Sequence, residues 1–118
     1  MKTSSKKGKG RRLQNFVRDR LYEYFPSLRT GDIKSAVMGE SGEDIKLSPA
    51  AKDLISFSFE CKNQERLNIW DSLSQAETNS SGRIPVVVFK RNRSKTYIAF
   101  EFEEFLNLIG DNSEQEKK

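Results

Sequence analysis

Three charged residues in the middle of the chain have the types and spacing that metal-dependent hydrolysis uses. Glu60 and Lys62 lie two residues apart, and Asp44 precedes Glu60 by sixteen residues. Two carboxylates held close together raise each other's pKa unless a cation lies between them. Because the chain has no histidine and one cysteine, oxygen ligands of this kind favour Mg²⁺, with Mn²⁺ as a substitute.

Each member of this set has a distinct expected role. Asp44 and Glu60 would hold the metal ion, and the backbone carbonyl of Cys61 would add a third ligand. Lys62, a compact point charge, would hold an attacking water or stabilise the departing charge. The alternative is structural, since a Glu-x-Lys pair is also common on the solvated face of a sheet.

Two alternating segments must position these residues. In residues 56–62, Phe57, Phe59 and Cys61 share one face, which leaves Glu60 and Lys62 on the opposite face. Cys61 is therefore expected to be a small buried hydrophobic residue. Residues 43–48 alternate in the same way, and a hairpin between the two strands would bring Asp44 to Glu60.

The remaining pattern gives the element order α-β-β-β-α-β-β-α. An apolar helix face covers about residues 11–24, a short strand follows at 33–38, and Pro49 closes the strand at 43–48. A second helix is expected over 66–79, with Ile69, Leu73 and Ala76 on its apolar face. The run 85–89 predicts a strand buried on both sides, with a strand at 96–100 and a helix at 102–109 after it. This order indicates an α/β fold, a central mixed sheet flanked by helices.

Composition sets the expected domain organisation. The 118 residues are 35% hydrophobic and 32% charged, and both ends are polar. The sequence predicts one domain at residues 11–110, a disordered basic arm at 1–10 and a disordered tail at 111–118. Residues 1–34 carry ten Lys or Arg against three Asp or Glu, and the rest carry eleven against fourteen. This asymmetry suggests nucleic acid as a partner, or else a solubilising tail.

The same composition excludes several classes of protein. One cysteine allows no disulfide within the chain, and the lack of histidine removes the usual zinc sites and the Ser-His-Asp and Cys-His forms of catalysis. No apolar run follows the basic start, and no segment is apolar enough to span a bilayer. A cytoplasmic protein with no membrane partner is expected, in the host cytoplasm if the chain is phage-encoded.

Three motifs in this order carry a family resemblance. They are Gly42-Glu43-Asp44-Ile45, then Phe59-Glu60-Cys61-Lys62-Asn63-Gln64, then Gln75-Ala76-Glu77. The chain resembles the PD-(D/E)xK nuclease superfamily, which has a restriction-endonuclease-like core. Within it, the chain is most similar to small bacteriophage nucleases and archaeal-type Holliday junction resolvases, over about residues 10–109.

The resemblance implies a role for each matching position. Asp44 and Glu60 would be metal ligands, and Lys62 the catalytic lysine. Gln75 would orient a water or contact the backbone near the scissile phosphate, and its alternative is an exposed helix residue. The chain departs from many members at Gln14, where the first helix often supplies an acid. It also has Glu43 in place of proline before Asp44, and a solvated turn residue is expected there.

Basic residues around this site would contact DNA phosphates, which position the substrate without reading its sequence. The expected DNA-binding residues are Lys6, Lys7, Lys9, Arg11 and Arg12 in the arm, Lys34 and Ser35 in the first strand, and Lys90, Arg91, Arg93 and Lys95 in a turn. Trp70 would stack on a base or lie in the core or a dimer interface.

The leading hypothesis is a Mg²⁺-dependent DNA endonuclease. By resemblance, its substrate would be branched DNA such as a Holliday junction, and the enzyme would be a homodimer, because a four-way junction needs two paired cuts. The main alternative is a DNA-binding module of phage origin without catalysis. A structural phage protein is a third hypothesis, which would leave the charged set on one strand face unexplained.

Overall fold

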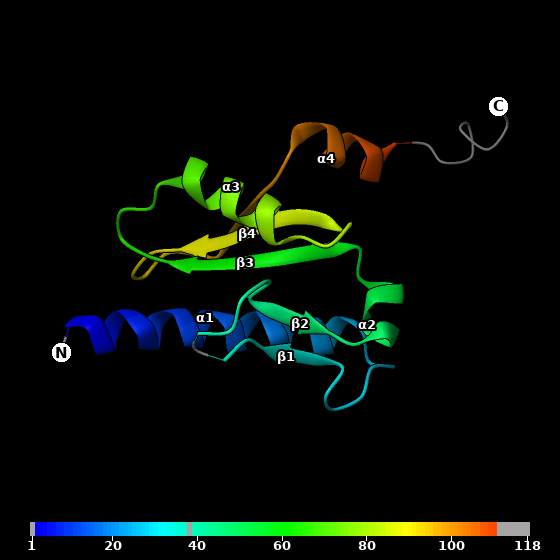
Figure 1. Cartoon of the computed structure of the whole chain (residues 1–118), viewed down its shortest axis with the longest axis horizontal. Helices are drawn as coiled ribbons and strands as arrows, with labels where there is room; N and C mark the ends of the chain where they lie inside the picture. The colour runs from blue at the N-terminus through cyan, green and yellow to red at the C-terminus, as the bar shows by residue number, and fades with distance from the viewer. Residues whose placement is uncertain (1, 38, 111–118) are drawn as a thin grey trace, which may run out of the picture.

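The chain folds into an α/β arrangement in which helices lie on both sides of a mixed sheet, as the sequence predicted (Figure 1). A computed structural model describes residues 2–37 and 39–110, with the backbone alone for residues 2–5. The elements in chain order are α1 (Lys2–Tyr24), β1 (Ile33–Ser35), β2 (Ile45–Leu47), α2 (Pro49–Leu54), β3 (Phe57–Asn63), α3 (Ile69–Asn79), β4 (Ile84–Lys90), β5 (Tyr97–Ala99) and α4 (Phe102–Ile109).

The strands form two sheets instead of one. β3 pairs in parallel with β4, and β4 pairs antiparallel with β5. β1 and β2 form a separate antiparallel pair. The expected hairpin between β2 and β3 is replaced by a single main-chain link, in which the Asp44 N–H donates to the Phe59 carbonyl at 3.1 Å. The two segments nevertheless meet at Asp44, which is the position that matters for the site.

Helix α2 lies between β2 and β3, where the sequence analysis expected no element. The Ser48 hydroxyl caps the helix by accepting from the Ala51 N–H at 3.1 Å, and Pro49 occupies the first turn. Proline fits there because the first helical N–H groups have no partner within the helix. Ala51 and Ile55 are buried, so the helix turns the chain back onto the core before β3 begins.

Helix α1 begins at Lys2, so the expectation of a disordered arm differs from the structure over residues 2–10. The lysines of this segment are good helix formers, and its C-terminal end has a partner in β3. The Asn63 side-chain amide donates to the Lys9 carbonyl at 3.3 Å, and Lys9 and Gly10 are half-buried. The basic segment is therefore held against the end of β3. The tail predicted at 111–118 lies outside the described residues.

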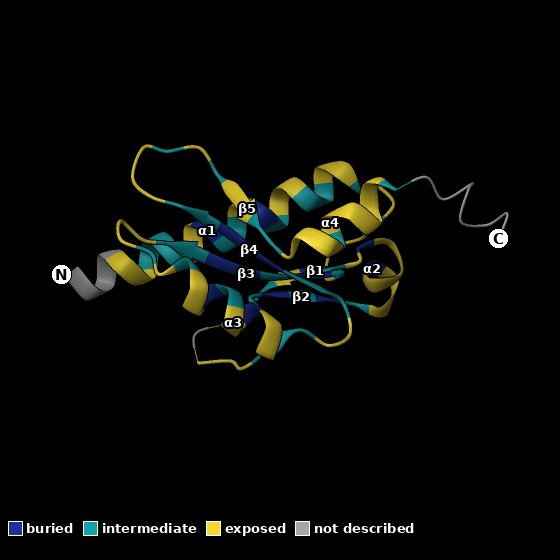
Figure 2. Cartoon of the chain, turned by 90° about the horizontal axis from the view of Figure 1, so that it is seen from above, coloured by how far each residue is buried: buried dark blue, intermediate teal, exposed yellow. Residues whose placement is uncertain are grey.

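The apolar core fills the space between α1 and β3. Figure 2 shows buried segments along β2, β3 and β4 in dark blue. The buried cluster consists of Leu13, Val17, Ile33, Ile45, Leu47, Ala51, Ile55, Cys61 and Val88. Cys61 is thus a buried hydrophobic residue, as expected. Each large aliphatic side chain buried here contributes about 1.5–3 kcal/mol, and this packing fixes the orientation of β3.

The opposite face of the sheet lies against α3. The α3 side chains that are buried are Ser72 and Ala76, whose small size lets the helix approach the strands closely. β4 is buried on both sides at Val86, Val87 and Val88, as its continuous apolar run predicted. No described helix is long and apolar enough to cross a membrane.

Candidate active site

Two hydrogen bonds hold Asp44 beside the Glu-x-Lys strand. The Asp44 N–H donates to the Phe59 carbonyl, and the Cys61 N–H donates to Asp44 Oδ2 at 2.7 Å. Because the N–H and C=O of one strand residue point to the same side, the Cys61 carbonyl also faces the Asp44 side. The structure therefore brings Asp44, Glu60 and the Cys61 carbonyl together.

Glu60 lies between β3 and α3 and is only 5% exposed. The Asn79 side-chain amide, from the last turn of α3, donates to Glu60 Oε1 at 3.3 Å. Lys62 Nζ lies 3.7 Å from Glu60 Oε2, an ion-pair distance longer than a hydrogen bond. Each Glu60 oxygen thus has one partner, and the lysine is free to reach a third group.

The electrostatics of the two acids are incompletely balanced. Burial raises the pKa of Asp44, and the Cys61 N–H and the charges of Lys62 and Lys46 oppose this shift only in part. Burial also raises the pKa of Glu60, and the negative charge of Asp44 raises it further. Asn79 and Lys62 lower the Glu60 pKa without cancelling the rise. The pair would therefore gain from a further cation.

The donor set suits a hard divalent ion. Two carboxylates and a main-chain carbonyl are oxygen ligands, which Mg²⁺ prefers, and Mg²⁺ keeps several of its waters when bound to few protein groups. Within the described residues, no group of three or more Asp, Glu, His or Cys side chains is placed to hold a metal. Any ion here would accordingly depend on Asp44, Glu60, main-chain oxygen and water. Gln14 and Asp44 line one small cavity, so Gln14 lies near Asp44, where the resemblance led us to expect an acid.

Glu43, expected to be a solvated turn residue, is buried in an ion pair. Arg83 Nη2 lies 2.6 Å from Glu43 Oε2, and both side chains are about 10% exposed. Arg83 Nε also donates to the Phe57 carbonyl at 3.1 Å. The arginine therefore fastens the residue before Asp44 to the start of β3. Sequence reasoning missed Arg83, and its separation of 40 residues from Glu43 left no local signal.

The helix residue that reaches the acids is Asn79, not the expected Gln75. Gln75 is exposed on α3, and no hydrogen bond links its side chain to Asp44, Glu60 or Lys62 among the described contacts. Since the side chains of Ser72 and Ala76 face the sheet, the next position on that face is Asn79. Gln75 is thus an exposed helix residue in the free protein, and its expected contact with a water or the DNA backbone stays a prediction.

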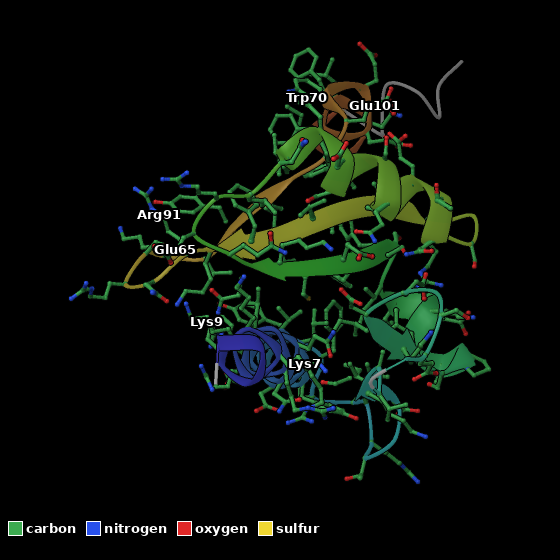
Figure 3. The ribbon with its side chains drawn as sticks, turned by 60° about the vertical axis from the view of Figure 1, so that its left-hand side comes forward. Lys7, Lys9, Glu65, Trp70, Arg91 and Glu101 are labelled. Atoms are coloured by element: carbon green, nitrogen blue, oxygen red, sulfur yellow. The ribbon has the colours of Figure 1, made fainter. Side chains whose placement is uncertain are left out.

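The basic residues of α1 lie beside the acids. Lys6 and Lys9 line a cavity with Lys62, and Lys7 and Arg11 line one with Asp44. Figure 3 shows Lys7 and Lys9 projecting from the N-terminal end of α1. Arg12 is exposed and lines a separate hollow with Asn63.

The second basic cluster lies at the same end of the molecule. The connection from β4 to β5 carries it, near the C-terminal end of β3 (Figures 1 and 2). Its members are Lys90, which is half-buried, and Arg91, Arg93 and Lys95, which are exposed.

Two other expected contacts are placed differently. The Ser35 hydroxyl donates to Asn15 Oδ1 at 2.8 Å, so it is engaged within the protein, and Lys34 next to it is exposed. Trp70 is 78% exposed near the start of α3, as Figure 3 shows. It is therefore not a core residue, one of the roles expected for it.

Comparison with protein-family models, with curated proteins and with solved structures finds no match to the chain. What this protein can do chemically therefore has to be inferred from its own residues and their geometry.

Proposed function

We propose that this protein is a Mg²⁺-dependent DNA endonuclease that hydrolyses phosphodiester bonds. One observation carries the proposal, the hydrogen bond from the Cys61 N–H to Asp44 Oδ2. It joins two distant segments so that two carboxylates and the Lys62 ammonium converge at one edge of β3. Ordinary packing gives no reason to bury two acids so close together, since their repulsion opposes folding and the neighbouring lysines offset the burial only in part.

The residues of the site divide the chemistry among them. Asp44, Glu60 and the Cys61 carbonyl would hold the ion, which when bound supplies positive charge to the phosphoryl oxygens and acidifies a water. Lys62 would position the attacking water or stabilise the departing oxygen through its charge. Asn79 fixes the orientation of Glu60 through its hydrogen bond. The basic side chains of α1 and of the β4–β5 connection would hold the DNA backbone.

We further propose branched DNA as the substrate and a homodimer as the active form. Two-fold symmetry would place two such sites on opposite strands of a four-way junction.

A cleavage panel tests the proposal. Duplex, flap, single-stranded and four-way junction DNA would be incubated with Mg²⁺ and with wild-type protein, Lys62→Ala or Lys52→Ala. Lys52 is exposed on α2 and serves as the control lysine. We expect wild type and Lys52→Ala to cut junction or flap DNA, and Lys62→Ala to lose about 10²–10³-fold in rate, as for removal of one charge-stabilising group.

The alternative is DNA binding without catalysis, favoured by the basic surface of α1 alone. Binding of junction DNA by wild type with no cleavage in Mg²⁺ or Mn²⁺ would establish that alternative and end the hydrolytic proposal.

A further inference from the structure

Two cavities flank the candidate site and meet at one residue of α1. The larger, of about 600 Å³, is lined by Lys6, Lys9, Gly10, Lys62, Asn63 and Arg66 among others. The smaller, of about 230 Å³, is lined by Asp44 and by α1 residues that again include Gly10. Gly10 is the α1 residue that the two linings share. A path from Asp44 to Lys62 along the helix surface therefore crosses Gly10.

Packing within the protein does not require glycine at this position. A Cβ added at Gly10 would meet no atom within 4 Å, and glycine is less favourable than alanine inside a helix. The position is half-buried and close to β3, since the neighbouring Lys9 carbonyl accepts from Asn63. A side chain at Gly10 would therefore extend into open space on the helix surface that borders both cavities.

The larger cavity has the charge of an anion site. Lys6, Lys9, Lys62 and Arg66 line it against one carboxylate, Glu65. That carboxylate already accepts the Asn92 N–H at 2.5 Å. Such a surplus of cations favours a phosphate chain over an apolar ligand.

Asn63 adds a polar group to the wall of this cavity. Its Nδ2 donates to Lys9, whereas its Oδ1 is buried without a hydrogen-bond partner among the described residues. Because the sugar–phosphate backbone of DNA offers acceptors and no donors, Asn63 serves the cavity by holding α1 against β3 through its Nδ2, and not by contacting a ligand.

We propose that the sugar–phosphate backbone of one DNA strand crosses α1 at Gly10, with Lys6, Lys9 and Arg66 binding the phosphates next to the scissile one. This inference rests on the proposed nuclease function and specifies its substrate. A volume of 600 Å³ is that of a small-molecule site, which admits the backbone of a single strand and not a duplex. We therefore place here a strand separated from its complement beside the cut, as in a flap or a junction, and the comparison of flap with duplex DNA tests this.

A matched pair of glycine substitutions tests the crossing. Gly10→Leu places a side chain in the open space between the two cavity linings. Gly8→Leu, on the same helix, lies outside both cavity linings, and its Cβ meets only the end of the Arg12 side chain, at 3.1 Å. Both variants should melt at or above the wild-type temperature, because leucine is the better helix former. Binding would be measured by fluorescence anisotropy in a Lys62→Ala background, with labelled flap and duplex oligonucleotides.

We expect Gly10→Leu to bind the flap about tenfold more weakly, whereas Gly8→Leu binds like the parent. As a second measurement, Arg66→Ala should weaken flap binding and reduce the salt dependence by about one phosphate contact. Should Gly10→Leu fail to fold, Arg66→Ala decides the matter alone.

The inference is overturned if the folded Gly10→Leu and Arg66→Ala both bind the flap like the parent, or if duplex binding weakens as much as flap binding. Because these measurements use a variant without Lys62, they are independent of hydrolysis. A protein that never cuts DNA but loses flap binding on Gly10→Leu would retain the crossing and lose the nuclease function.

Discussion

Glu43 and Asp44 are neighbours directly before β2. Their carboxylates have different electrostatic surroundings. Glu43 pairs with Arg83 at 2.6 Å, and both partners are nearly buried. Asp44 instead lies near Glu60 without an ion pair of its own, and burial raises its pKa despite the nearby charges of Lys62 and Lys46. Glu43 therefore has a direct counter-charge, whereas Asp44 has no ion pair among the described residues.

The difference suggests a structural role for Glu43 and a metal-binding role for Asp44. The Glu43–Arg83 pair, with the bond from Arg83 to the Phe57 carbonyl, fixes where β2 meets β3. The Asp44–Glu60 pair is left with negative charge that a metal ion would offset. Substitutions in the two pairs should therefore change the free energy of unfolding in opposite directions.

The largest effect is expected at Arg83. Arg83→Met leaves Glu43 buried without a counter-charge, which typically costs about 3–5 kcal/mol. Urea unfolding followed by circular dichroism would measure the loss. The double variant Glu43→Gln/Arg83→Met should recover most of it, because the uncompensated charge is removed. A loss below about 1 kcal/mol for the single variant would show that the pair does not hold the strands together.

A smaller effect of opposite sign is expected at Glu60. Glu60→Gln keeps an oxygen for the Asn79 amide and removes the repulsion with Asp44. We expect the metal-free protein to gain about 0.5–2 kcal/mol, a common size for stabilising substitutions at functional sites, and to lose cleavage. Unfolding in EDTA would measure the gain. Equal or lower stability would indicate that Lys62 already balances the acids.

The pH dependence of this gain follows from the direction of the pKa shift. The Glu60 pKa is raised in the folded protein above the ordinary value of 4.5, so the folded state binds the proton more tightly. The destabilisation by Glu60 is therefore full above the raised pKa and disappears as the pH falls toward 4.5. The advantage of Glu60→Gln should shrink over that range. Hydrogen bonds from Arg29 and Ser48 lower the pKa of Asp32 below its ordinary value of 3.8. The stability that Asp32 contributes is therefore lost only at pH values below 3.8 and does not interfere with this range.

The smallest effect is expected at Asn79. The Asn79 amide lowers the Glu60 pKa, so Asn79→Ala should move the acidic limb of the pH–rate profile to higher pH. The stability loss should be about 0.5–1.5 kcal/mol, that of one hydrogen bond. Gln75→Ala is the matched control on the same helix, because its side chain is exposed. An equal shift for Gln75→Ala would restore the role expected from the sequence.

The sequence predicted the strand that carries the site because its alternation has a clear period. Phe57, Phe59 and Cys61 pack toward the core, and Glu60 lies on the other face. The sequence did not predict helix α2, because a proline at position 49 fits the end of a strand as well as the start of a helix capped by Ser48. A local pattern cannot distinguish two elements when both are compatible with the same residues.

The parts of the site that were not predicted depend on tertiary contacts. The expected α3 face used Ile69 and Leu73, whereas the buried residues are Ser72 and Ala76, which turns Asn79 toward Glu60. Helix α1 likewise includes residues 2–10, and its Lys9 carbonyl is held to β3 by the Asn63 amide, a contact between distant residues. A polar composition alone therefore suggested disorder where packing supplies order.

The buried Cys61 side chain has a practical consequence. It is the sole thiol of the chain and lies against the core between α1 and β3. Burial raises its pKa far above the usual range, and the nearby Asp44 and Glu60 charges raise it further. The native protein should therefore resist alkylation and disulfide exchange, which require a thiolate. The rate of any slow labelling of Cys61 by Ellman's reagent would then report the rate at which α1 opens locally away from β3.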